Sequence, residues 1–135
     1  MKTTISLLFV VMALAFGFKQ NKPGESPIVE KGMIKVSVLY PGGEGKTFDW
    51  NYYSGKHVPM VKNLLGDSVK VISIDKGIAG RTPGSPATYV AMFHMYFKTI
   101  TAYQNSFGPN AEKIIKDIPN YTNIQPLVQI SEVQQ

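Results

Sequence analysis

The chain of 135 residues contains no cysteine. A disulfide framework, a zinc–thiolate site and a cysteine nucleophile are therefore excluded. Charged residues make up only 17% of the sequence, below the roughly 25% of average soluble domains, so long charged tails are not expected. The length supports one domain, with or without an extension, and is too short for a large multidomain enzyme.

The N-terminal region also lacks an apolar run long enough to cross a membrane. The uncharged stretch Thr3–Phe18 has 16 residues, whereas a transmembrane helix needs roughly 20. Lys2 precedes this stretch, and the small residues Ala15 and Gly17 lie near its end, which is the pattern of a secretory signal peptide. We expect residues 1–17 to be such a signal and the protein to be exported to the periplasm or secreted. An uncleaved N-terminal membrane anchor is the alternative.

The remaining chain has a modest and scattered excess of positive charge. Removal of residues 1–17 takes away one of the 14 Lys+Arg residues and none of the 9 Asp+Glu residues, so the net charge becomes 13 − 9 = +4. Nucleic-acid binding requires a concentrated basic face, and the scattered lysines do not indicate one. Residues 18–32 are polar and contain two Pro and two Gly, which is typical of a flexible tether. The folded domain is therefore expected at residues 33–135.

Within this domain, the pattern of apolar residues predicts four strands, at residues 33–40, 69–77, 88–97 and 127–133. One helical region is expected from Asp49, an N-cap residue, to Gly66, with a kink at Gly55 and Pro59. Another begins after Thr99, is interrupted at residues 108–109 and ends at residue 118. The order β-α-β-β-α-β predicts an α+β, ferredoxin-like antiparallel sheet with both helices on one face.

The strand at residues 88–97 is apolar on both of its faces. One set of alternating positions is Ala91, Phe93, Met95 and Phe97, and the other includes Met92, His94 and Tyr96. Because the helices cover only one face of such a sheet, a second apolar face requires another cover. A second copy of the same sheet provides one, so we expect a homodimer.

The segment FDWNYYSGKHVPMV at residues 48–61 resembles the EthD family, named for ethyl tert-butyl ether degradation. Residues 75–97 and 117–133 are similar to the same family, so that the resemblance covers nearly all of residues 33–133. This resemblance implies a dimeric α+β barrel, in which two ferredoxin-like subunits pack sheet to sheet and enclose a pocket. It also implies relatives that include small cofactor-free oxygenases, lactone isomerases and polyketide-tailoring enzymes, while many members have no assigned reaction.

His57 is the main catalytic candidate, because its pKa lies near neutrality and it can take or give a proton. In EthD-like proteins the matching histidine lies near the mouth of the pocket. Tyr53 could present a phenol as a donor or an oxyanion stabiliser. The alternatives are a histidine that stabilises the broken helix and a tyrosine that packs under the sheet.

His94, Met92 and Tyr96 are expected to line the inter-sheet cavity if Phe93 and Phe97 pack on the helices. A buried, hydrogen-bonded core histidine is the alternative for His94. Further polar residues that could line the same cavity are Lys35, Ser37 and Gln129, with solvated strand positions as the alternative.

These observations predict an exported homodimer that binds a small apolar molecule in its inter-sheet cavity. The chemistry would be proton transfer of the isomerase type or cofactor-free oxidation, without a metal or a cofactor. His57 would be the acid or base, with Tyr53 and His94 positioning the ligand. A mixed metal site of His57 with Asp75 is possible by residue type but has no supporting spacing. A non-catalytic, small-molecule-binding or stress-associated dimer is the main alternative, and a haem-using relative of the same fold is a third.

Overall fold

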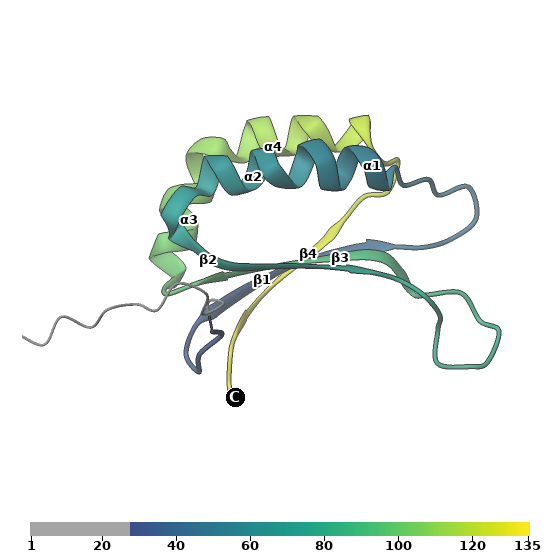
Figure 1. The fold of residues 1–135 in the computed structure, drawn as a ribbon, viewed down its shortest axis with the longest axis horizontal. Coiled ribbons are helices and arrows are strands. Elements are labelled where there is room, and N and C mark those ends of the chain that lie inside the picture. Colours follow the sequence, from purple (N-terminus) through teal and green to yellow (C-terminus); the bar gives the residue numbers. More distant parts are fainter. Residues whose placement is uncertain (1–27) are drawn as a thin grey trace, which may run out of the picture.

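The computed structural model describes residues 28–135, so the signal peptide expected at residues 1–17 and most of the tether lie outside it. Four strands form one antiparallel sheet with all helices on one side (Figure 1). The strand order is β2-β3-β1-β4, so the first and third strands are central. The bounds of the strands are β1 Ile34–Pro41, β2 Val69–Lys76, β3 Tyr89–Phe97 and β4 Leu127–Glu132. The ferredoxin-like α+β fold and its element order are confirmed.

The first helical region consists of three consecutive pieces, α1 (Trp50–Tyr52), a π-helical turn (Tyr53–His57) and α2 (Val58–Leu65). The Asp49 carboxylate accepts a hydrogen bond from the Tyr52 amide at 3.0 Å and caps the start. Pro59 has no amide hydrogen for the preceding turn, and the Val58 amide instead donates to the Tyr53 carbonyl, five residues back. The predicted kink is therefore a wide helical turn, and His57 lies at its end.

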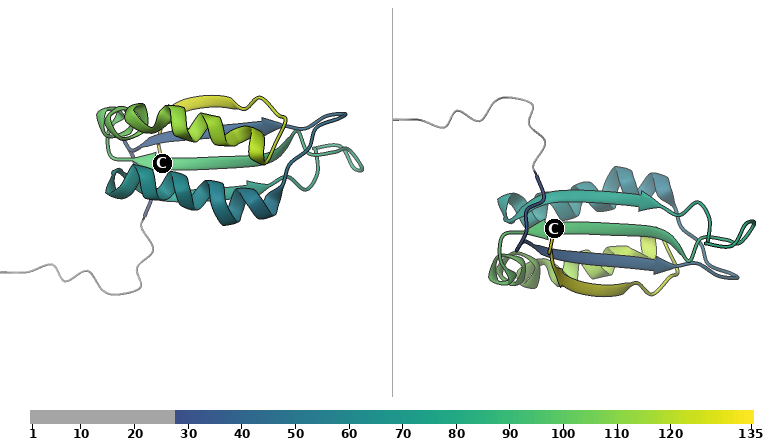
Figure 2. Two further views of the ribbon diagram at one scale, coloured as in Figure 1. Left: turned by 90° about the horizontal axis from the view of Figure 1, so that it is seen from above. Right: turned by 90° about the horizontal axis from the view of Figure 1, so that it is seen from below.

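The second helical region is similarly divided. The Thr99 hydroxyl caps α3 (Ile100–Phe107) by accepting from the Ala102 amide at 3.0 Å. A short 3₁₀ turn at Gly108–Asn110 separates it from α4 (Ala111–Asp117), which runs into a further 3₁₀ turn at Ile118–Asn120. Viewed from above, both helical regions lie across the sheet, one over β2 and β3 and the other toward β4 (Figure 2). The interruption expected at residues 108–109 is confirmed.

The core lies between these helices and the sheet. The alternation along β3 is complete, because Ala91, Phe93, Met95 and Phe97 are all buried under the helices. From β1, Val36 and Tyr40 belong to the same core. Fully burying each of the large side chains stabilises the fold by roughly 1.5–3 kcal/mol. The residues between them therefore point away from the helices.

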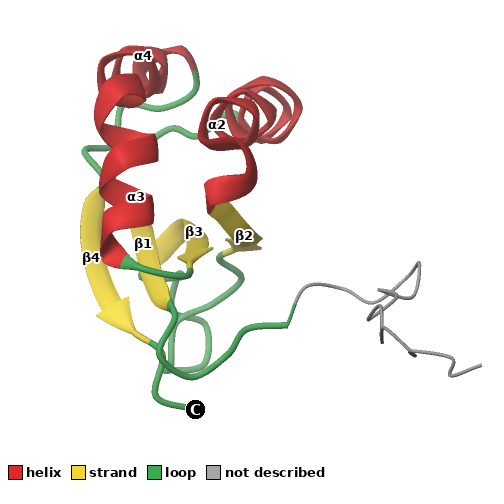
Figure 3. Cartoon of the chain, turned by 90° about the vertical axis from the view of Figure 1, so that its left-hand side faces the viewer, coloured by secondary structure: helices red, strands yellow, loops and turns green. Residues whose placement is uncertain are grey.

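On the opposite side of the sheet, which we call the open face, no helix of residues 28–135 lies over the strands (Figures 2 and 3). The register places Ser37 between His94 of β3 and Gln129 of β4, so these three side chains share this face. Leu39, Met92 and Leu127 form a neighbouring row of the same face. No helix within residues 28–135 has the length and apolarity needed to span a membrane.

Candidate functional site

A cavity of about 440 Å³ lies between the helical layer and the sheet of a single subunit, and it is open to solvent at one edge, where the lining residues Ile115, Gln125 and Val128 are exposed. Its walls are mostly aliphatic and aromatic, and β1, β3, α2, α3, α4 and the segment before β4 all contribute to it. A volume of this size is typical of pockets for small organic molecules. The lining side chains are Val36, Val38, Tyr40, His57, Val61, Phe93, Met95, Tyr103, Phe107, Ile114, Ile115, Ile118, Pro119, Ile124, Gln125, Pro126 and Val128.

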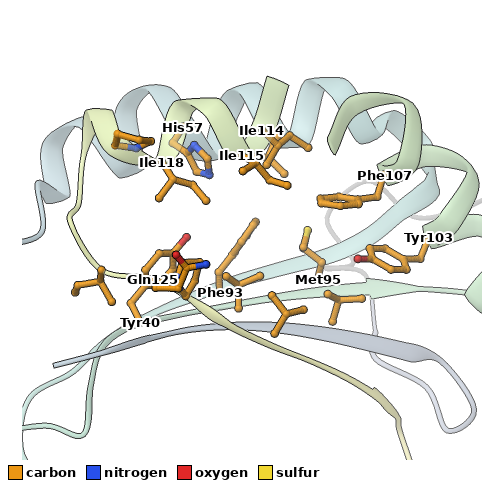
Figure 4. Close-up of a pocket in the computed structure, with 17 residues that line it drawn as sticks. Tyr40, His57, Phe93, Met95, Tyr103, Phe107, Ile114, Ile115, Ile118 and Gln125 are labelled. Carbon is orange, nitrogen blue, oxygen red and sulfur yellow. The ribbon is translucent and has the colours of Figure 1, made fainter. Parts of the chain in front are cut away.

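Polar groups gather at one end of this cavity (Figure 4). His57 enters from the helical layer, while Tyr40 and Gln125 lie across from it on the sheet side. Phe107 and Tyr103 mark the opposite end. The cavity thus combines an apolar body with a polar end, which suits a ligand that has one polar group on an apolar skeleton.

His57 is held by a carboxylate behind it. Its side chain is only 3% exposed, and its Nδ1 atom lies 2.8 Å from Oδ2 of Asp117 at the end of α4. The other carboxylate oxygen, Oδ1, accepts from the Tyr52 hydroxyl at 2.8 Å and from the Asn120 amide at 2.9 Å. These three hydrogen bonds fix the carboxylate, and the carboxylate in turn fixes the orientation of the imidazole ring.

A chain of hydroxyl groups continues from the other side of the imidazole. The Tyr121 hydroxyl lies 3.3 Å from Nε2 of His57 and 2.8 Å from the Tyr40 hydroxyl. Because the ionised carboxylate of Asp117 can only accept, Nδ1 of His57 must donate to it. In the neutral ring Nε2 is then an acceptor, so the Tyr121 hydroxyl donates to Nε2 and the Tyr40 hydroxyl donates to Tyr121. Both ring nitrogens of His57 thus have partners within the chain.

The local environment holds the pair as a neutral imidazole and a carboxylate. Burial lowers the pKa of His57, and Asp117 opposes this shift only in part. Burial alone would raise the pKa of Asp117, but the hydrogen bonds from Asn120, His57 and Tyr52 outweigh it and lower the pKa. Burial raises the pKa of both Tyr40 and Tyr121, so these phenols remain protonated.

Tyr53 packs against this network. Its ring stacks on the His57 imidazole with centroids 5.5 Å apart and planes 16° from parallel. It also packs against Phe48 at 4.9 Å, the contact expected of a hydrophobic staple. The side chain is fully buried, and its hydroxyl has no hydrogen-bond partner among residues 28–135. Tyr53 supports the imidazole ring, and it is not among the side chains that line the cavity.

Asp117 connects this site to the outer surface of the helical layer. It borders a shallow, open hollow together with Met60, Pro109, Glu112, Lys113, Lys116 and Asn120. His57, whose Nδ1 atom it holds, lines the internal cavity on the other side. The carboxylate therefore lies between the solvent and the buried imidazole.

The other predicted ligand-binding residues lie on the open face of the sheet. Nδ1 of His94 is 2.9 Å from the Ser37 hydroxyl, and its Nε2 atom is 3.5 Å from the half-exposed carboxylate of Asp75. The ammonium group of Lys35 lies 5.7 Å from the centre of the Tyr96 ring. Burial lowers the pKa of His94, Lys35 lowers it further, and Asp75 opposes the shift. Met92 and Gln129 lie on this same face.

The sheet therefore separates the predicted residues into two groups, and this arrangement corrects the expectation of one shared site. His57 and Tyr53 lie on the helix side, whereas His94 and the five residues around it lie on the open face. The apolar cavity next to His57 is also on the helix side and within one subunit. A strand has a period of two, so Phe93 and His94 cannot face the same side. Asp75 pairs with Met92 on the open face, so His57 and Asp75 cannot form a metal site.

Three residues of the His57 network were not predicted from the sequence, namely Asp117, Tyr121 and Tyr40. One local signal was present, because an acidic residue at the C-terminal end of a helix opposes the helix dipole and requires a compensating contact. Asp117 occupies that position in α4. Tyr40 and Tyr121 have no comparable signal, since they are hydrogen-bonded to each other although they lie 81 residues apart along the chain.

The fold and the site define a ferredoxin-like α+β protein with a histidine–aspartate pair at the end of an internal apolar cavity. Residues 43–125 match the EthD domain model. A crystal structure of an EthD-like protein from Ralstonia eutropha JMP134 is 41% identical, with a TM-score of 0.72, and the match covers 76% of this chain and 93% of that one. The chain therefore belongs to the EthD family.

A second solved structure, an EthD family protein from Bacillus halodurans C-125, shares the fold. It is 17% identical with a TM-score of 0.53, and the match covers 74% of this chain and 97% of the other. No curated protein matched the sequence. The residues of the cavity do not fit a haem group with His57 as the axial ligand, because the Tyr121 hydroxyl occupies Nε2, the only ring nitrogen that Asp117 leaves available.

Proposed function

We propose that this EthD family protein binds a small, largely apolar molecule in the cavity between its helices and its sheet, and transfers a proton to or from that molecule. The single observation that carries this proposal is the His57–Asp117 pair at the polar end of an otherwise apolar cavity of about 440 Å³. A neutral imidazole held by a carboxylate is a general base, because the carboxylate stabilises the imidazolium that forms. The apolar walls supply the binding energy for the ligand.

Proton abstraction next to a carbonyl group is the reaction class that this arrangement supports best. In that reaction a C–H bond of the ligand breaks, the proton goes to the enzyme base, and the negative charge moves to the carbonyl oxygen. The amide of Gln125 lies at the same end of the cavity and is a donor suited to that oxygen. Return of the proton at another carbon gives an isomerisation without a cofactor.

The test uses 2-tetralone, an apolar ketone with acidic C–H bonds, as the probe. Its incorporation of deuterium in D₂O should be faster with the protein than with buffer, and His57→Gln should remove most of the difference. Lys56→Gln is the matched control, because Lys56 precedes His57 and is exposed. Binding of 2-tetralone without any acceleration of exchange would contradict the proton transfer and support a binding protein without turnover.

That second function, a non-catalytic small-molecule-binding module, is favoured by one specific observation. Both nitrogens of His57 have partners within the chain, and its side chain is 3% exposed. A histidine with these contacts can also serve only to join α4 to the π-helical turn. The deuterium-exchange experiment separates these two functions, because only the catalytic one requires acceleration.

We further propose that the open face pairs with the same face of a second copy. Met92, Tyr96 and Leu39 give this face an apolar character, and no helix of the described part of the chain covers it. Burial of such a face against itself gives the two-fold symmetric dimer that is commonest among homo-oligomers. Light scattering during size-exclusion chromatography should give twice the mass of one chain, and the mass of a single chain would contradict the pairing.

Export of the protein is proposed from the N-terminal sequence alone. Lys2, followed by the uncharged stretch Thr3–Phe18, has the length and composition of a cleavable signal. Intact-mass measurement on protein recovered from outside the cytoplasm should show a chain that lacks approximately the first 17 residues. Recovery of the full-length chain from the membrane fraction would support an uncleaved anchor instead.

A further inference from the structure

The hydroxyl groups of Tyr121 and Tyr40 form a chain that leads from His57 to the cavity. His57 borders the cavity, but Nδ1 is bound to Asp117 at 2.8 Å and Nε2 faces the Tyr121 hydroxyl at 3.3 Å. Tyr121 is buried and does not line the cavity, whereas Tyr40, its partner at 2.8 Å, does. In this resting arrangement, the first oxygen of the chain that is open to a ligand belongs to Tyr40.

We propose that a ligand in the cavity exchanges protons with His57 through the hydroxyl groups of Tyr121 and Tyr40, and that the Tyr40 hydroxyl is the member of this hydroxyl chain that contacts the ligand. This inference rests on the proposed function, because it requires a ligand in this cavity. Asp117, at the outer hollow, is the solvent-facing end of the same chain. This chain thus gives a proton a route from the cavity through the helical layer to the outer surface.

Each step of the proton transfer along this hydroxyl chain breaks one bond to hydrogen and forms another. When a ligand O–H group donates to Tyr40, its proton forms a new bond to the Tyr40 oxygen. The former Tyr40 proton passes to the Tyr121 oxygen, and the former Tyr121 proton passes to Nε2 of His57. The imidazolium is then paired with Asp117, and the ligand carries the negative charge. The site had one net negative charge before the transfer and has one after it, so no additional charge is buried.

The direction of the chain also selects the kind of polar group that binds. With neutral His57, Tyr40 donates to Tyr121 and offers a lone pair to the cavity, which suits a phenol or an enol. With protonated His57, Nε2 donates to Tyr121, Tyr121 donates to Tyr40, and the Tyr40 hydroxyl donates into the cavity, which suits a carbonyl oxygen. The ligand group that binds Tyr40 is therefore a hydroxyl, of a phenol or an enol, when His57 is neutral, and a carbonyl oxygen when His57 is protonated.

Among residues 28–135, few other titratable groups face the His57 ring. Asp117 approaches from α4, Tyr121 from the segment after α4 and Tyr40 from β1, while Tyr53 stacks on the ring from the same helical region. β3 contributes the apolar Phe93 to this cluster, through its contact with Tyr53. A pH response transmitted to Tyr40 is therefore assigned to His57 and its carboxylate.

A ligand-free measurement tests the chain directly. In protein labelled with ¹³C at the Cζ atom of tyrosine, the Tyr40 signal should shift with pH at the midpoint at which the His57 ring titrates, although Tyr40 itself remains protonated. Tyr121→Phe should remove this shift. Tyr53→Phe is the matched control and should retain it, because the Tyr53 hydroxyl lies in the same cluster but has no hydrogen-bond partner within the described chain. A Tyr40 signal that ignores the His57 titration, or still follows it in Tyr121→Phe, would overturn the inference.

A binding experiment separates this inference from the proposed function. The probes are 2-naphthol, 2-acetonaphthone and naphthalene, which carry a hydroxyl group, a carbonyl group and no polar group on the same skeleton. Acidification through the measured His57 midpoint should lower the dissociation constant of 2-acetonaphthone relative to that of 2-naphthol by about tenfold, the equivalent of one hydrogen bond. Tyr40→Phe should abolish the change. Binding of all three probes without this pH-dependent change would refute the hydroxyl chain and leave the pocket intact. Failure of every probe to bind would refute the proposed function.

Discussion

Replacement of Asp117 by asparagine should reverse the tautomer of His57. Oδ1 of Asp117 accepts from Tyr52 and Asn120, and Oδ2 accepts from His57. An asparagine of the same shape keeps its oxygen toward the first two partners and therefore turns its NH₂ group toward Nδ1 of His57. That nitrogen must then accept, so the ring proton moves to Nε2. Long-range ¹H–¹⁵N NMR correlations of the ring report which nitrogen carries the proton.

The same substitution should cost stability by an amount that depends on pH. A charge-assisted hydrogen bond becomes a neutral one, which corresponds to a loss of about 1–2 kcal/mol at neutral pH. The pKa of Asp117 is lowered in the folded state, so its contribution is present above the ordinary value of 3.8 and is lost as the pH falls through the lower folded value. Urea unfolding should therefore show a gap between wild type and Asp117→Asn at pH 7 that narrows below about pH 4.

Glu112→Gln is the control for that experiment. Glu112 pairs with Lys116 on the exposed side of α4, and such surface pairs contribute little, so its unfolding free energy should change by less than about 0.5 kcal/mol. The reasoning would be refuted by an Asp117→Asn protein that is as stable as wild type at pH 7 and keeps its ring proton on Nδ1.

Three further predictions concern stability and assembly. Tyr53→Phe should raise the free energy of unfolding by about 1 kcal/mol in urea, because it removes a buried hydroxyl that has no hydrogen-bond partner within residues 28–135. A loss of stability would show that this hydroxyl is bonded. Gly77→Ala should destabilise by about 2 kcal/mol or more, since its Cβ atom would clash with the Tyr89 carbonyl oxygen. Gly55→Ala, in a helical turn with open space, should stabilise by about 0.5–1 kcal/mol. Equal effects of the two substitutions in thermal unfolding would contradict this contrast. Met92→Lys should convert the proposed dimer into single chains in light scattering. Ile78→Lys, in an exposed loop, should leave the dimer unchanged. A Met92→Lys protein that remains a dimer would show that the interface lies elsewhere.

The fold could be predicted from the sequence because its signals are local. Asp49, Thr99 and Pro59 each act on backbone groups within a few residues, and all three do in the structure what their chemistry predicts. The alternation along β3 likewise placed Phe93 and Phe97 on one face and His94 on the other, and the structure shows that the face with the two phenylalanines is the buried one. Local signals of this kind fix element boundaries and faces.

The site depends instead on contacts between distant segments, and the sequence reasoning placed it incompletely. His57 was identified from its chemistry, but its partner Asp117 lies 60 residues away and is brought to it only when α4 packs beside the first helical region. The direction in which the His57 side chain points from its helical region was also not accessible, because a wide turn ends at that residue and changes this direction. His57 and His94 were therefore assigned to one cavity although the sheet separates them.

The position of the ligand pocket is the central claim of this account, and two neighbouring residues of β1 test it most directly. Val38 lines the internal cavity, whereas Leu39 points to the open face. Fluorescence titration with 2-naphthol should show that Val38→Phe, which fills the cavity, weakens binding by about tenfold or more, while Leu39→Phe binds as wild type does. Loss of binding in Leu39→Phe with retention in Val38→Phe would contradict the account and place the ligand between the sheets of the two copies in the proposed dimer.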